Sequence, residues 1–117
     1  VFNFITEGTY YKEGDNYYIT YNESYLTGMD GTTTTLKVEP DAVTLIRSGN
    51  VSSLMVFKKG RKHTSEYSTE YGTFEVGVTA QKVSVNMNDL GGNIDVEYFI
   101  EVNNQLTSFT TLNVKVQ

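Results

Sequence analysis

The chain has 117 residues, no cysteine and one histidine, and its 14 acidic side chains outnumber its 9 basic ones to give a formal net charge of −5. This length suits a single domain with its own core. The lack of cysteine excludes disulfides and thiolate metal sites and favours a reducing cytoplasm, and the acidic balance offers no basic field for nucleic acid. No apolar run approaches the roughly twenty residues of a membrane span, so a membrane partner is not expected. From these observations together we expect a cytoplasmic protein without a nucleic-acid partner, a metal ion or a cofactor.

Apolar and polar side chains alternate with a period of two through most of the chain, most clearly over residues 73–80 and 93–102. Successive side chains of a strand point to opposite faces, so this pattern predicts antiparallel strands with one buried and one solvated face. Turn residues divide the pattern into ten predicted strands, which in chain order are residues 2–11, 17–23, 32–38, 43–47, 51–57, 64–71, 73–80, 82–88, 93–102 and 106–116.

The segments between these strands carry residues typical of tight turns. Gly14 and the pair Asn103-Asn104 tolerate a positive φ, and Pro40 ends a strand because it lacks an N–H group. Such short connections favour pairing between chain neighbours, which is an up-and-down meander. We therefore predict an all-β fold in one domain, residues 1–117. The meander is expected to close into an antiparallel barrel of 8–10 strands, with a two-sheet sandwich as the alternative.

Motifs that specify a reaction are absent from the sequence. His63 lies in a basic segment and is interpreted as a residue of a solvated turn, and one histidine cannot build a two-histidine metal site. Gly91-Gly92 precedes a strand and indicates a hairpin rather than a phosphate-binding loop. We therefore predict no catalytic and no metal-binding residues.

Several polar residues fall in phase with the apolar face of their strands. Glu23 is an even number of residues from Tyr17, Ile19 and Tyr21 and so shares their face of the strand. Arg47 shares the face of Val43 and Leu45 in the same way. A charge does not enter an apolar interior without a partner, so an ion pair between Glu23 and Arg47 is expected.

Tyrosines share this inward phase and suggest a cavity with aromatic walls and hydroxyl tips, the composition of a small-molecule pocket. The predicted ligand-binding residues are Tyr21, Glu23, Arg47, Tyr67, Thr69, Tyr71 and Tyr98. In this hypothesis Arg47 meets an anionic or carbonyl group, Glu23 holds Arg47, and the four tyrosines form walls around a small, partly apolar ligand.

Three alternatives remain open at this stage. In the first, the tyrosines fill the barrel and the ion pair fixes its closure. In the second, Phe99 and Phe109, which are out of phase with the buried face, form a homodimer surface on the outside of the barrel. In the third, Glu23 performs acid–base chemistry, which is the least favoured because a buried carboxylate beside an arginine is more often structural.

Five segments in this order resemble the YwiB-like family of small bacterial proteins: residues 6–11, 17–23, 33–37, 46–49 and 67–72. The resemblance implies an antiparallel barrel similar to lipocalins and other calycins, with no assigned biochemical function. The residues that match the family are Tyr21, Glu23, Arg47, Gly49, Tyr67, Thr69, Tyr71 and Gly72. Family members usually carry another strand before the segment that begins at Thr6, so we expect either that an upstream first strand is missing from this chain or that the barrel closes differently.

Overall fold

All regular elements of the described chain are β-strands. The computed structural model describes residues 7–23 and 29–117, so the start of the first predicted strand, residues 2–6, lies outside it. The nine strands are β1 (Gly8–Glu13), β2 (Asn16–Asn22), β3 (Thr32–Val38), β4 (Ala42–Gly49), β5 (Ser53–Lys58), β6 (Lys62–Thr69), β7 (Gly72–Asn88), β8 (Gly91–Val102) and β9 (Gln105–Val116). Within these residues no helix is long and apolar enough to cross a membrane.

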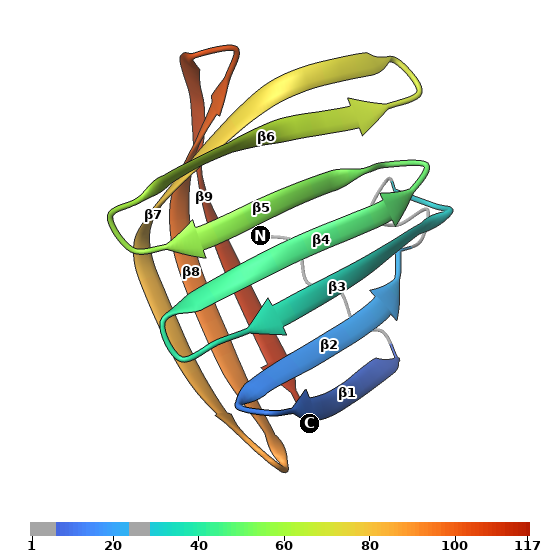
Figure 1. The fold of residues 1–117 in the computed structure, drawn as a ribbon, viewed down its shortest axis with the longest axis vertical. Helices are drawn as coiled ribbons and strands as arrows, with labels where there is room; N and C mark the ends of the chain where they lie inside the picture. The colour runs from blue at the N-terminus through green and yellow to red at the C-terminus, as the bar shows by residue number, and fades with distance from the viewer. Residues whose placement is uncertain (1–6, 24–28) are drawn as a thin grey trace.

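The strands form two antiparallel sheets whose order follows the chain, β1-β2-β3-β4-β5 and β6-β7-β8-β9 (Figure 1). The prediction of an all-β meander is therefore confirmed. The sheets meet where β5 runs beside β6 (Figure 1). Ser52 and Ser68 exchange two backbone hydrogen bonds of 2.9 Å, and across the turn the backbone N–H of Arg61 donates to the carbonyl of Lys58 at 3.0 Å.

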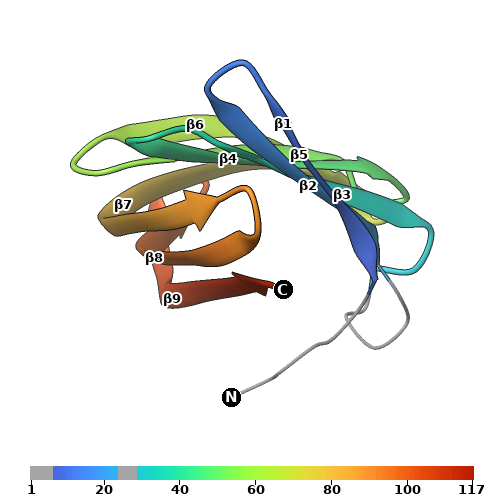
Figure 2. The ribbon, with the colours of Figure 1, turned by 90° about the horizontal axis from the view of Figure 1, so that it is seen from below.

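Closure into a barrel, in contrast, is not observed in the described residues. The two sheets face each other as layers, and the outer strands β1 and β9 do not pair (Figure 2). The alternation in the sequence reports only that each strand has one buried face. A closed barrel and two facing sheets satisfy that requirement equally well, so the pattern could not decide between them.

The core lies between the sheets and contains residues of both. One row of directly opposed residues crosses the first sheet, from Ile19 to Leu36 to Leu45 to Met55. The second sheet presents buried residues to it, among them Val78, Ile94 and Val96, which are at most 1% exposed. Phe57 is completely buried, and its ring centroid lies 4.5 Å from that of Tyr98 on β8.

Strand β7 replaces two of the predicted strands, residues 73–80 and 82–88. It runs without interruption for 17 residues, and its pairing with β8 shifts between Ala80 and Lys82. Gln81 is thus the extra residue of a β-bulge. Before Gln81 the even-numbered residues of β7 face the core, and after it the odd-numbered residues do. In the sequence this change of phase looks the same as a boundary between two strands, so one strand was predicted as two.

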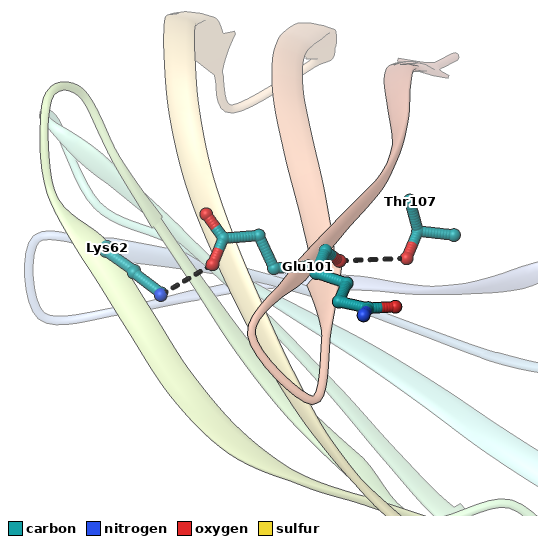
Figure 3. A network of polar contacts seen from close by, with 4 residues as sticks. Lys62, Glu101 and Thr107 are labelled. Atoms are coloured by element: carbon teal, nitrogen blue, oxygen red, sulfur yellow. Dashed lines mark hydrogen bonds and ion pairs between the residues drawn. The ribbon is translucent and has the colours of Figure 1, made fainter.

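The predicted turn at Asn103-Asn104 is confirmed, because both residues have a positive φ, 50° and 67°. On the outer face, Lys62 of β6 reaches across β7 to Glu101 of β8 with an Nζ–Oε2 distance of 2.6 Å (Figure 3). Gly77 lies under this bridge: a Cβ atom at Gly77 would stand 2.8 Å from Cε of Lys62. The missing side chain therefore lets the lysine cross the strand.

Candidate functional site

A cleft of about 440 Å³ opens between the two sheets. Its walls come from inward-facing positions of β4 and β5 in one sheet and of β6, β7 and β8 in the other. The lining residues are Leu45, Arg47, Met55, Tyr67, Phe74, Val76, Tyr98, Ile100 and Val102. Arg47 is the one charged side chain among them.

The pairing of the strands explains why these side chains meet. Tyr67 of β6 lies directly opposite Phe74 of β7, and Val76 of β7 lies opposite Val102 of β8. Directly opposed residues of an antiparallel pair point to the same face. The cleft therefore follows from strand register.

A row of polar residues crosses the first sheet beside the apolar row. Tyr21 of β2 opposes Thr34 of β3, Thr34 opposes Arg47 of β4, and Arg47 opposes Ser53 of β5. Thr34 is completely buried and Ser53 is 6% exposed. Nε of Arg47 and Oγ of Ser53 are buried without a hydrogen-bond partner in the described part of the chain. Such atoms are costly unless a further group satisfies them.

Glu23 lies next to this row but does not pair with Arg47. It is 5% exposed, and its Oε1 accepts a hydrogen bond of 2.6 Å from the hydroxyl of Thr34. None of the four ion pairs among residues 7–23 and 29–117 contains Glu23 or Arg47. The expected ion pair is therefore wrong for the described chain: a neutral threonine occupies the sheet position between the two charges and takes one carboxylate oxygen.

The phenol of Tyr21 stands close to both charges. The pKa of Tyr21 is raised to about 12, first by burial and then by the negative charge of Glu23 and a hydrogen bond with it, while Arg47 and Thr34 act in the opposite direction. Burial also raises the pKa of Tyr98, and the charge of Arg47 partly opposes this shift. Arg47 therefore lies near tyrosines of both sheets.

This shift predicts a loss of stability at alkaline pH. Because the pKa is raised on folding, the stabilisation is fully present below the unfolded value of about 10 and disappears as the pH rises to about 12. After solvent screening is discounted, we expect a loss of at most about 2 kcal/mol. Tyr21→Phe should flatten the dependence of the urea midpoint on pH between about pH 10 and 12.

The matched control is Tyr18→Phe, because Tyr18 stacks on Tyr11 away from this cluster with ring centroids 5.1 Å apart. The control should decline with pH like the unmodified protein. An equally steep decline for Tyr21→Phe would contradict the role of the phenol.

The structure brings together some of the predicted ligand-binding residues and separates others. Arg47, Tyr67 and Tyr98 line the cleft, and Tyr21 packs against the core at the polar row. Tyr71 is 86% exposed in the turn between β6 and β7, so its prediction as a wall is wrong.

Thr69 also lies apart from the cleft, because its hydroxyl accepts a hydrogen bond from the backbone N–H of Tyr71 and donates one to the carbonyl of Gly72. Thr69 is the last residue of β6 and Tyr71 lies in the turn after it, and the alternating pattern extends through both without a visible break.

Sequence reasoning missed the apolar half of the site. Met55, Ile100 and Val102 are lining residues whose inward phase was readable, but phase alone does not separate a cleft wall from packed core. Ser53 keeps step with Met55 and could have been found in the same way. His63 was also misplaced: it lies in β6, half-buried, and its Nδ1 has no hydrogen-bond partner among the described residues.

Metal ligands do not gather in the described residues: no group of three or more His, Asp or Glu side chains is placed to hold a metal ion. The cleft instead combines apolar walls with one guanidinium group. Apolar walls with a few polar groups are the usual composition of a small-molecule pocket.

Comparison with known proteins agrees with this all-β arrangement. A family model described as a domain of unknown function (DUF1934) matches residues 1–114. The chain is similar to the uncharacterized beta-barrel protein YwiB of Bacillus subtilis (strain 168), with 26% identity over 105 residues that make up 90% of this chain and 72% of that protein.

The crystal structure of the ywiB protein from Bacillus subtilis has a similar fold. It aligns with a TM-score of 0.78 and 23% sequence identity, and the alignment covers 96% of this chain and 77% of that one. At this identity the likeness concerns the fold alone.

Proposed function

Because this chain belongs to the family described as a domain of unknown function (DUF1934), membership brings no activity with it, and we propose from the geometry that the protein binds a small, partly apolar molecule in the cleft between its sheets. The carrying observation is the buried, unpartnered Nε of Arg47 in an otherwise apolar cleft of about 440 Å³. Ligand pockets commonly have this size and this mixture of apolar walls with a few polar groups.

The walls support binding rather than a fully packed interior. Of the four tyrosines expected to fill or line the interior, only Tyr67 and Tyr98 line the cleft, and they leave its volume open. Phe74, another wall residue, is 41% exposed. Large apolar side chains beside open volume are favourable contacts for an apolar ligand.

The proposal is tested with 1-decanol, a neutral amphiphile, in a methyl NMR titration of the complete chain. Binding in the cleft should shift the methyl signals of Met55, Ile100 and Val102 together and leave those of Leu112 and Val114, which do not line the cleft, unchanged. Shifts spread evenly over all methyl groups, or none at all, would contradict a binding cleft.

A pair of valine substitutions tests the location. Val102→Phe adds a ring to the wall of the cleft and should weaken decanol binding by at least about tenfold, because the ring occupies ligand volume. Val116→Phe is the control, since Val116 is also a half-buried valine but lies outside the lining. Equal affinities of the two variants would place the binding elsewhere.

A second candidate function is self-association through the outer face of β8 and β9. Phe99 and Phe109 are 36% and 48% exposed, and their ring centroids lie 4.9 Å apart. Exposed aromatic pairs of this kind occur at interfaces, and they also stabilise strand pairing within one chain.

Sedimentation at several concentrations distinguishes these roles. A functional homodimer should weaken when Phe99 and Phe109 both become serine, but not when the exposed Tyr11 and its half-buried stacking partner Tyr18 both do. A protein that stays monomeric at every concentration removes this candidate.

Closure into a calycin-like barrel is also part of the proposal. The hydroxyl of Tyr10 donates to the carbonyl of Asn88 at 2.5 Å, and that of Tyr17 lies 3.5 Å from Oδ1 of Asp89. These contacts support closure because they hold the first hairpin against the turn between β7 and β8. Slow amide exchange along β1 and β9 is expected for paired outer strands, and fast exchange for open ones.

The lack of cysteine supports a cytoplasmic location.

A further inference from the structure

We infer that the ligand of this cleft is an apolar monocarboxylate, with its carboxylate on Arg47 and its apolar body against the walls from β5, β7 and β8. This inference rests on the proposed function and adds to it the chemical class of the ligand. Three properties of the site carry it: an unsatisfied guanidinium donor, the volume of the apolar part, and a negative charge close to the arginine.

The unsatisfied donor calls for an anion or a strong acceptor. Nε of Arg47 is buried without a hydrogen-bond partner among the described residues, and no carboxylate in residues 7–23 and 29–117 forms an ion pair with this arginine. A carboxylate accepts two parallel hydrogen bonds from the edge of a guanidinium group, and such charge-assisted pairs are about twice as strong as neutral ones.

The apolar part of the cleft limits the size of the body. At roughly 30 Å³ for each water-sized group, the cleft of about 440 Å³ holds at most about 15 non-hydrogen atoms. Met55, Val76 and Val102 contribute walls without a hydrogen-bonding group, so a polar body would lose its contacts with water and gain none in return. A medium-chain or aromatic acid fits these limits.

The charge beside Arg47 favours a single negative charge on the ligand. Glu23 and Arg47 both act on the phenol of Tyr21, so the two charged groups share one neighbourhood. Oε2 of Glu23 is buried without a partner in the described part of the chain, and its charge would repel a second charge on the ligand. A phosphate monoester, which carries nearly two charges, is therefore disfavoured.

Three probes with the same alkyl chain test the inference: decanoate, 1-decanol and decyl phosphate, each titrated below its critical micelle concentration into the complete chain at pH 7. Decanoate should bind at least about tenfold more tightly than decanol, because only the acid satisfies Arg47 with a charged acceptor. Decanoate should also bind more tightly than decyl phosphate.

Variants then assign the preference to one side chain. Arg47→Met should abolish the preference, so that the variant binds decanoate no more tightly than decanol, because a methionine keeps the apolar contacts of the stem but offers no hydrogen-bond donor. Arg47→Lys should keep part of the preference, since the charge remains and the fork of donors is lost. Arg61→Met removes the other arginine, which is exposed and outside the cleft, and should change nothing.

The outcomes separate this inference from the proposed function. If decanol and decanoate bind in the cleft with equal affinity, or if decyl phosphate binds most tightly, the inference is overturned and cleft binding stands. If the preference for decanoate survives in Arg47→Met, the inference is also overturned. If none of the probes shifts the cleft methyl signals, the proposed function itself is lost. The comparison of the three probes on the unmodified protein decides the matter even when Arg47→Met does not fold.

Discussion

Replacing Phe57 by alanine should lower the free energy of unfolding by about 3–5 kcal/mol, one of the largest effects expected in this protein. Phe57 is completely buried near the end of β5, opposite Val43 of β4, and its ring is tilted at 42° against Tyr98 of the other sheet. The substitution removes the apolar surface of the ring and leaves a cavity where the two sheets meet. Chemical denaturation followed by far-UV circular dichroism measures the change.

Leu54→Ala is the matched control, because Leu54 belongs to the same strand but is 40% exposed on the outer face. We expect it to cost less than about 1 kcal/mol, since an exposed side chain loses little buried surface. Similar losses for the two variants would mean that the sheets do not pack together through Phe57.

A single methyl group at Gly92 should destabilise the protein by more than about 3 kcal/mol. Gly92 has a φ of 149°, and a Cβ atom there would collide with the backbone carbonyl oxygen of Asn86 and stand 2.8 Å from Cα of Met87. Both obstacles are backbone atoms of β7, so Gly92→Ala has to displace the strand itself. Thermal unfolding of the alanine variant measures the effect.

Gly72 separates the two causes of this penalty. Its φ of 138° is nearly the same, but a Cβ atom at Gly72 would meet no atom within 4 Å. Gly72→Ala should therefore cost only the conformational part, about 1–2 kcal/mol. If both glycine variants lost the same stability, the close contact between β7 and β8 at Gly92 would not exist in solution.

Much of the fold was predictable because strands report their faces directly. The residues 32–38 were expected to alternate, and the observed burial follows that alternation at every position of β3. The prediction was wrong where two different structures produce the same pattern of apolar and polar residues in the sequence. The bulge at Gln81 reverses the phase as a strand boundary does, and facing sheets bury one face of each strand as a closed barrel does.

The site was predictable to a smaller extent. Arg47 and Tyr98 were correctly placed toward the interior because phase fixes the face of the sheet, and both line the cleft. Phase does not fix position along the sheet, so Tyr71 was placed in a wall although it lies in an exposed turn. Nor does it identify a partner: Thr34, a residue without charge, takes the place beside Glu23 that was expected for Arg47.

The bulge at Gln81 has a consequence for how this chain can change in length. In β7 the residues Val76 and Val78 face the core before the bulge, and Val83 and Val85 face it afterwards. Loss of Gln81 alone would keep Val83 and Val85 on the core face, because Ala80 would then be followed directly by Lys82 and the pairing with β8 would continue without a shift. Related chains that lack this one residue are therefore expected to have a regular β7, so the strand should occur with and without the bulge at a difference of one residue in length.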